Sequence, residues 1–278
     1  MSRTPDGPPP PAAVQKLRIR FAKRGRLRFT SHRDFQRAFE RALRRAGVPM
    51  AYSAGFSPHP KISYVGAAPT GTASEAEYLE IAVTAELHPG SVQVALDEAL
   101  PPGLDVLEVV EGRSGSLPER IEASVWHVRL PGLSAGRVGS AVRVFLASDD
   151  VPVERVVKDG RRRLNARAAV LRAEVSGDDD CAILTMVVRH LVPAVRPDDV
   201  LVGLRQVADL APPVPPSVTR LAQGLLDEGL PADRLADPLA PDRSSAAGSA
   251  PTADGTPGTR PDLVGVPDVV GVSTATRG

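Results

Sequence analysis

The sequence of 278 residues has one cysteine, few aromatic side chains and no long apolar run. The single Cys181 excludes a disulfide within the chain and any cysteine-rich zinc or iron–sulfur site built from this chain alone. No apolar run approaches the roughly 18 residues of a membrane-spanning helix, and residues 1–11 lack the apolar core of a signal peptide. These absences predict a soluble, cytoplasmic protein with no membrane partner.

Several catalytic motifs are also missing. The sequence contains no Gly-x-x-x-x-Gly-Lys-Ser/Thr loop for nucleotide phosphates, no Gly-x-Gly-x-x-Gly between a strand and a helix, and no Gly-x-Ser-x-Gly elbow. The histidines and acids show no metal-ligand spacing, so we expect no metal site. A non-catalytic, accessory role is therefore favoured over an enzymatic one.

Charge is balanced overall but strongly segregated along the chain. The net charge is +1, yet residues 16–47 hold twelve Lys and Arg against two acids, while residues 66–112 hold nine acids and no Lys or Arg. Acidic and basic faces can pair inside one fold, or the basic segment can bind a polyanion. We favour the second interpretation, because the guanidinium forks of arginine suit phosphate groups.

Composition divides the chain into four parts. Residues 1–14 and 231–278 are rich in Pro, Gly, Ala, Ser and Asp, and they predict a disordered arm and a disordered tail. Between them, residues 15–113 and 118–230 show two similar successions of apolar periodicities, which predict two units.

The first unit contains the best-defined predicted element of the chain. Alternation of Leu17, Ile19 and Phe21 with arginines predicts a half-buried strand with a basic outer face. Ser31 is a predicted helix N-cap, and apolar residues then recur at helical spacing until Gly47 ends the helix. Strands at 61–65, 78–85 and 104–110 and a helix at 91–100 complete a β-α-β-β-α-β order.

The second unit repeats this order less clearly. We expect strands at 121–130, 151–158, 168–175 and 182–190, helices at 138–146 and 197–207, and a hairpin turn at Asp159-Gly160. The predicted fold class is therefore α+β, with two tandem ferredoxin-like units.

A candidate RNA site combines the basic helix with the loop that follows it. Arg37, Arg41, Arg44 and Arg45 cannot all fit the buried stripe of the helix, so they line its flanks and outer face. The Gly- and Pro-rich loop YSAGFSPHP and the residue after it add side chains suited to stacking on a base and meeting a phosphate: Tyr52, Phe56, His59 and Lys61. A purely structural loop, packed by its own aromatic residues, is the alternative.

Two histidines are the candidates for catalysis. His32 follows the predicted N-cap of the basic helix, where an imidazole could hold a phosphate or act as a base. His59 sits between two prolines that stiffen the loop. A capping-region or surface role for His32 is equally consistent with its position.

The stretch from Ser31 to Ile81 resembles the radical SAM-linked protein family, a domain of unknown function. The matching residues are Ser31, His32 and Asp34, then FERALRRAG (39–47), then the loop residues Tyr52, Ser53, Gly55, Phe56, Pro58, His59, Pro60, Ile62 and Ser63, and finally Ser74, Glu75, Glu77, Tyr78 and Leu79. Members of this family occur fused to, or encoded beside, a radical SAM protein. The resemblance implies such a partner, and with it an iron–sulfur cluster and S-adenosylmethionine in the partner rather than in this chain.

Three functional hypotheses follow. The first is an accessory protein that binds RNA and presents it to a radical SAM protein or to RNA-processing machinery. The second is an RNA-cleaving or RNA-modifying enzyme that uses His32 and His59 as acid and base. The third is a protein-only docking scaffold whose arginine face meets an acidic partner.

Overall fold

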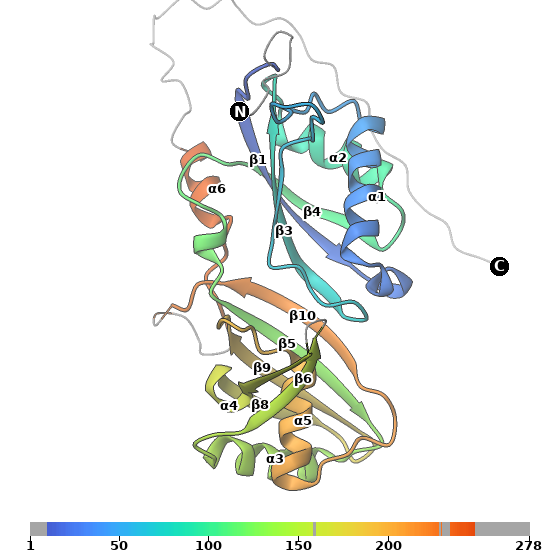
Figure 1. Cartoon of the computed structure of the whole chain (residues 1–278), viewed down its shortest axis with the longest axis vertical. Helices are drawn as coiled ribbons and strands as arrows, with labels where there is room; N and C mark the ends of the chain where they lie inside the picture. Colours follow the sequence, from blue (N-terminus) through green and yellow to red (C-terminus); the bar gives the residue numbers. More distant parts are fainter. Residues whose placement is uncertain (1–9, 158–159, 228, 230–233, 248–278) are drawn as a thin grey trace, which may run out of the picture.

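The computed structural model of the chain describes residues 10–157, 160–227, 229 and 234–247. Over these residues the fold is mixed α+β, with six α-helices, one eight-stranded sheet and a separate two-stranded sheet. Two lobes, at residues 15–111 and 123–224, lie end to end (Figure 1). No helix among the described residues is long and apolar enough to cross a membrane.

The first lobe contains four strands and two α-helices: β1 (Gln15–Lys23), the 3₁₀ turn η1 (Gly25–Phe29), α1 (His32–Arg45), β2 (Ile62–Val65), β3 (Ala73–Val83), α2 (Pro89–Ala99) and β4 (Leu104–Glu111). The strand order is β4-β1-β3-β2, and each neighbouring pair is antiparallel. Both helices pack on one face of this sheet (Figure 1).

The core of the first lobe is formed by apolar residues that alternate along β1 and recur at helical spacing along α1. Leu17, Ile19 and Phe21 are at most 3% exposed and face the helices, as alternation along a strand requires. On α1, Phe35 and Phe39 pack against them, and the ring of Phe35 stacks on Phe21 at 4.7 Å. The helix predicted here is confirmed.

Both ends of α1 are fixed by local chemistry. The hydroxyl of Ser31 accepts the Asp34 N–H at 3.2 Å and donates to the Asp34 carboxylate at 2.7 Å. At the other end, Gly47 has a φ of +66°, a left-handed conformation that favours glycine.

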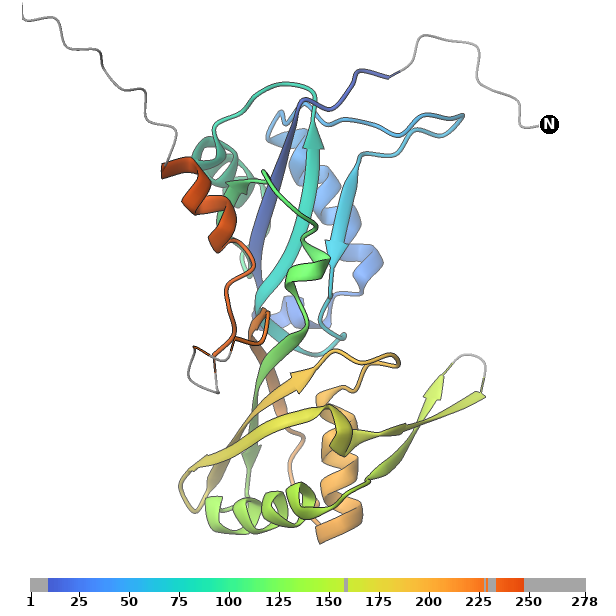
Figure 2. The same cartoon turned by 90° about the vertical axis from the view of Figure 1, so that its left-hand side faces the viewer.

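The second lobe repeats the strand pattern and adds a hairpin. Its elements are β5 (Ala123–Pro131), α3 (Ala135–Ala147), β6 (Pro152–Val157), β7 (Gly160–Asn165), α4 (Ala166–Ala169), β8 (Val170–Gly177), β9 (Cys181–Arg189), α5 (Pro197–Ala208) and β10 (Ser217–Gly224). The order in the sheet is β10-β5-β9-β8. The hairpin β6–β7 projects away from the body of the lobe (Figure 2); Asp159 of its predicted turn lies outside the described residues.

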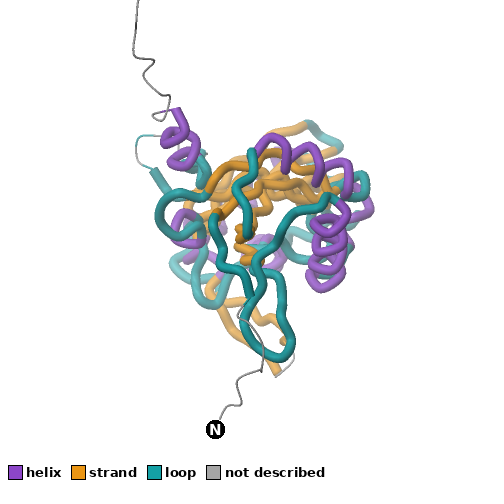
Figure 3. The backbone as a smooth tube through the Cα atoms, turned by 90° about the horizontal axis from the view of Figure 1, so that it is seen from above, coloured by secondary structure: helices purple, strands orange, loops and turns teal. Residues whose placement is uncertain are grey.

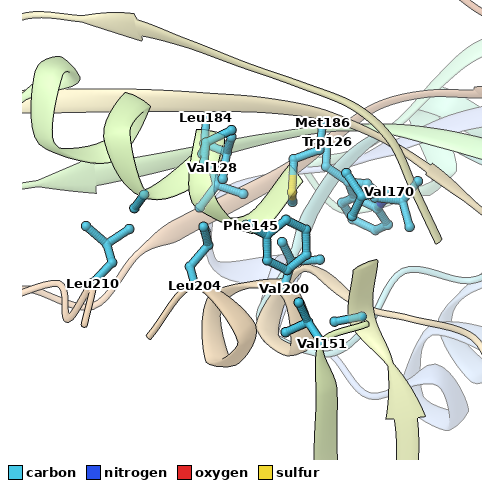
Figure 4. Close-up of a cluster of buried hydrophobic side chains, with 14 of the residues drawn as sticks. Trp126, Val128, Phe145, Val151, Val170, Leu184, Met186, Val200, Leu204 and Leu210 are labelled. Atoms are coloured by element: carbon cyan, nitrogen blue, oxygen red, sulfur yellow. The ribbon is translucent and has the colours of Figure 1, made fainter. Parts of the chain in front are cut away.

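The helices α3 and α5 cover one face of the second sheet with an apolar core. Phe145 of α3 and Leu204 of α5 are at most 1% exposed, and they meet Trp126, Leu184 and Met186 from the strands (Figure 4). This core is separate from that of the first lobe, so each lobe buries its own apolar residues.

One short parallel pairing joins the lobes into a continuous sheet. Thr219 and Arg220 of β10 pair with Ala73 and Ser74 at the start of β3. All the other strand pairs are antiparallel. The sheet is therefore mixed, and the seam between the lobes is two residue pairs long.

Residues 234–247 return to the first lobe and cover the sheet face that the helices leave open. Within them lies α6 (Ala240–Ala247), preceded by Leu239, which is fully buried beside Tyr78 and Val110. This segment falls inside the range 231–278 that composition predicts to be disordered, and there the structure differs from the expectation. The apolar side chains on this face of the sheet explain the docking, because they would otherwise meet water.

The basic outer face predicted for β1 is wrong at Arg18. Its side chain is 1% exposed and its guanidinium donates to Asp242 at 2.8 Å, to Glu80 at 2.9 Å and to the carbonyl of Ser114 at 3.0 Å. Asp242 belongs to α6, so the returning segment both buries and neutralises this arginine. The alternation on β1 is real, but both of its faces are covered.

Candidate nucleic-acid interface

A stripe of exposed arginines runs along the outer face of α1. We define the α1 stripe as Arg33, Arg37, Arg41, Arg44 and Arg45; each side chain is exposed. Spacings of three and four residues keep the stripe on one side of the helix, and it extends over about 18 Å at 1.5 Å per residue. The predicted outward orientation of Arg37, Arg41, Arg44 and Arg45 thus agrees with their exposure.

Among the described residues, one weak ion pair involves the α1 stripe. Arg37 lies 3.9 Å from Asp34, and both side chains are more than half exposed, so this contact is weak. Within the described part of the chain, no carboxylate forms an ion pair with the other four arginines of the stripe. Their guanidinium groups are available to an external anion.

The acidic segment 66–112 does not mask the stripe. Six of its nine carboxylates pair instead with cations outside α1: Glu75 and Asp105 with Arg24, Glu77 with Arg220, Glu80 with Lys16 and Arg18, Glu108 with Arg243, and Glu111 with Arg113. Segregated charge in the sequence therefore becomes paired charge around β1 and unpaired charge on α1.

The loop after α1 is a closed structure with an exposed aromatic tip. Tyr52 and Pro60 form a bridge, the Ser53 N–H donates to the His59 carbonyl at 2.9 Å, and the His59 N–H donates to the Ser53 hydroxyl at 3.0 Å. These contacts hold Phe56 at the tip, where it is 72% exposed. An aromatic ring in that position buries nothing inside the fold, so the alternative of a loop packed by its own aromatics does not describe Phe56.

The other predicted loop residues are also accessible to a ligand. Tyr52 is 38% exposed, and His59 and Lys61 are exposed. The loop projects from the end of the first lobe that lies away from the second lobe, where α1 ends (Figure 2), and Figure 3 views the molecule from that end. The structure therefore brings the loop to the end of α1 that carries Arg44 and Arg45.

The two candidate catalytic histidines lie apart. His32 is the first residue of α1, whereas the loop with His59 follows the last turn, so the 14-residue helix, about 21 Å long, lies between them. The His32 ring packs edge-on against Tyr64 at 5.3 Å, and its Nε2 lies 3.1 Å from Nε2 of Gln36. The structure does not unite the two imidazoles in one acid–base site.

A small enclosed cavity lies beneath His32. Its volume of about 20 Å³ has room for a single water molecule, and Lys23, Tyr64 and Glu77 line it with His32. Burial lowers the pKa of Lys23 and raises the pKa of Tyr64, whose hydroxyl is buried without a partner among the described residues. Sequence reasoning did not identify this cluster, because its members come from separate elements.

A buried ion pair at the seam was also not predicted. Arg220 of β10 and Glu77 of β3 are 3% and 4% exposed, and the guanidinium donates to the carboxylate. Burial alone would raise the pKa of Glu77, but the charge of Arg220 and hydrogen bonds from Ser74 and the Ala68 N–H hold it below its usual value. An arginine inside the apolar strand SVTRLAQG was the only sequence signal for this pair.

The described residues hold no cluster of three His, Cys, Asp or Glu side chains that could bind a metal ion. Two groupings of polar side chains in the first lobe are therefore candidates for function: an exposed basic surface, formed by the α1 stripe and the loop 52–61, and a buried cluster near the seam.

Comparisons with known proteins identify a family without a known activity. A family model described as an uncharacterized protein conserved in bacteria, DUF2344, matches residues 16–197. A search of curated proteins finds no match. Among solved structures, an unknown protein from Galdieria sulphuraria is similar at 15% identity over 76% of this chain and 99% of that chain, with a TM-score of 0.22.

That TM-score is too low to support any argument from the Galdieria sulphuraria protein. The family match does not mention a radical SAM protein, so that association stays a prediction. It does span well over half of the chain, and on this basis the protein belongs to the DUF2344 family of uncharacterized proteins conserved in bacteria.

Proposed function

We propose that this protein binds RNA in the cytoplasm through the α1 stripe and the loop 52–61, and presents it to a partner enzyme. One observation carries the proposal: four arginines of the stripe form no ion pair among the described residues, although nine acids lie in residues 66–112 of the same lobe. Six of these nine acids pair with cations outside α1, so they leave the α1 stripe positive for an external anion.

The chemistry of the surface favours RNA over an acidic protein. Arginine forks bind phosphate oxygens in pairs, and an exposed aromatic ring stacks on a splayed base. Phe56, with Tyr52 near it in the same loop, supplies such rings beside the cations of α1 and Lys61. An acidic protein surface would use the arginines but would have no need of an exposed phenylalanine at the loop tip.

The strand orders support a more specific description of the scaffold. The orders β4-β1-β3-β2 and β10-β5-β9-β8, each with two crossing helices, are those of ferredoxin-like units, the second carrying β6–β7 as an insertion. We propose that the two lobes are tandem ferredoxin-like units. The partner we propose is a radical SAM protein, which would supply the iron–sulfur cluster and S-adenosylmethionine; the resemblance over residues 31–81 supports this choice.

The test compares two variants with the same change of charge. In the first, Arg37, Arg41, Arg44 and Arg45 become Gln. In the matched control, four exposed arginines of the second lobe, Arg129, Arg137, Arg143 and Arg205, become Gln. Fluorescence anisotropy with a labelled single-stranded RNA measures affinity at several salt concentrations.

We expect the affinity of the native chain for RNA to fall as the salt concentration rises. In a plot of log K against log salt, the slope for the α1 variant should be smaller in magnitude by about 3, because each lost phosphate contact removes about 0.7 from the slope. The control variant should keep the slope. Equal loss in both variants would mean a nonspecific charge effect, and affinity that is independent of salt would exclude the proposal.

A further inference from the structure

A second cavity opens at the seam between the lobes, away from the α1 stripe. It has a volume of about 300 Å³, the lower end of the range for small-molecule pockets. Its walls come from both lobes: the loop after β2, with Gly66 and Ala67, faces β5, β9, β10 and the segment before α5. A ligand there would contact both lobes at once.

Two arginines line this cavity. Arg220 is 97% buried, with Nε on the Ser74 hydroxyl at 3.3 Å and Nη2 on Glu77; its Nη1 has no hydrogen-bond partner among the described residues. Arg196, the residue before α5, is exposed, and its guanidinium forms no ion pair with a carboxylate of the described residues. The cavity therefore offers guanidinium N–H donors from two sides.

Negative charge is absent from the cavity wall. No Asp or Glu of the described residues lines it. The nearby Asp199 is 6% exposed and is held by Arg155 at 3.0 Å and by the Arg196 N–H at 2.7 Å, so its charge is already matched. An anion in the cavity would meet two guanidinium groups and no carboxylate on the wall, while Glu77 pairs with Arg220 from behind.

The remaining polar wall is fixed and includes the only tryptophan of the chain. The Trp126 ring lies beneath Arg220, whose guanidinium carbon is 5.3 Å from the ring centroid. The His190 Nε2 lies 2.7 Å from the Ser124 hydroxyl. These contacts hold the side chains around the cavity in place, which is the preorganisation that a binding site needs.

We propose that this cavity is a phosphate-binding site, in which Arg196 and Arg220 hold the phosphate group of a nucleotide or of an RNA end. Planar guanidinium groups suit oxyanions such as phosphate, and two of them facing one cavity can bind different oxygens of the same phosphate group. Glu77 and Ser74 of β3 anchor the guanidinium of Arg220 through Nη2 and Nε, which leaves Nη1 free, so binding there would link the phosphate to the joint between the lobes.

The experiment uses the full chain and isothermal titration calorimetry, with Trp126 emission recorded in parallel. The probes are inorganic phosphate, adenosine monophosphate, and a short oligoribonucleotide with or without a terminal phosphate. The test variant is Arg196→Gln; the control is Arg205→Gln, which changes another exposed arginine, in α5. Both sites are exposed, so neither substitution threatens folding.

Saturable binding that Arg196→Gln weakens about tenfold, and that Arg205→Gln leaves unchanged, is the expected result. Binding of phosphate or the mononucleotide identifies a free ligand as the source. Binding only of the RNA with a terminal phosphate identifies an RNA end. No saturable binding of any probe, or binding that is insensitive to Arg196→Gln, overturns the site.

The proposal for this cavity and the proposal for the RNA-binding surface can be contradicted separately. The variant with Gln at the four α1 positions keeps the seam intact, so it should bind the mononucleotide as the native chain does. Loss of RNA binding with retained mononucleotide binding would support both proposals, whereas retained RNA binding in that variant would contradict only the function proposed for α1.

Discussion

β1 and α1 carry similar densities of positive charge, yet the fold treats them in opposite ways. Arg18 of β1 is 1% exposed and is held by carboxylates from β3 and α6. Arg41 and Arg45 of α1 are exposed and have no ion-pair partner among the described residues. The comparison teaches that a buried, ion-paired arginine stabilises contacts between segments far apart in the sequence. An exposed arginine without an ion-pair partner is instead available to bind a ligand.

The difference also resolves the two interpretations of the segregated charge. Internal pairing of acidic and basic segments describes β1, where Glu80 lies 2.9 Å from both Lys16 and Arg18. A positive surface without internal partners describes α1. Each interpretation therefore holds for one part of the same basic segment.

The largest effect is expected from removing the buried cation. Arg18→Gln leaves Asp242 and Glu80 each with one fewer partner in a buried site, so the free energy of unfolding should fall by about 3 kcal/mol. Arg41→Gln on α1 should change it by less than about 0.5 kcal/mol. Urea denaturation of both variants measures the contrast, and equal effects would remove the distinction between the two regions.

The buried ion pair at the seam should make the stability of the chain depend on pH in the acid range. Because the pKa of Glu77 is held below its usual value, its contribution to stability is present above about pH 4.3, the ordinary pKa, and is lost as pH falls through the folded-state pKa. Glu77→Gln should lower stability at neutral pH by about 2 kcal/mol and flatten the acid limb of the curve.

Urea midpoints measured between neutral and acid pH test this expectation. The α1 variants, which remove no carboxylate, serve as the control and should keep the acid limb of the native chain. A Glu77→Gln variant with the native pH dependence would show that the Arg220–Glu77 pair does not contribute in this way.

A smaller, purely functional effect is expected at the loop tip. Phe56→Ala should weaken RNA binding by about 1–2 kcal/mol, the worth of one stacked base, while the melting temperature stays unchanged because the ring is 72% exposed. Phe56→Trp should retain the affinity. Anisotropy and thermal melting measure the two properties separately, and a fall in melting temperature would place the ring in the fold rather than at the interface.

The smallest effect is expected at the start of α1. Ser31→Ala removes the hydroxyl that accepts the Asp34 N–H, which should lower stability by about 1 kcal/mol. The affinity for RNA should stay within twofold or so of the native value, because the arginines of the last turns keep their positions. Ser31→Asn, which retains a capping oxygen, is the matched variant.

Local patterns were sufficient to predict α1 and the first core. The cap at Ser31, the apolar spacing of Phe35 and Phe39, and the stop at Gly47 lie within one stretch of sequence, and each acts on its neighbours. For the same reason the exposure of the α1 arginines followed from the helical period alone. The loop after α1 was also predicted from its Gly and Pro content.

Contacts between distant segments could not be predicted in this way. Arg18 and Asp242 are separated by 224 positions, and Arg220 and Glu77 by 143. No periodicity reports such a pairing, so the burial of Arg18, the docking of Leu239 and the cavity at the seam became visible only in the fold. The composition of the tail predicted disorder because it contains few apolar residues, but one buried leucine and one buried aspartate are enough to dock it locally.

The most direct test of the central claim is crosslinking of the tagged full-length protein in cells, with bound RNA and bound protein identified from the same sample. The account predicts a defined class of crosslinked RNA that is lost when Arg37, Arg41, Arg44 and Arg45 become Gln and kept in the control with four changes in the second lobe. Recovery of a partner protein without RNA, unchanged in the α1 variant, would contradict it.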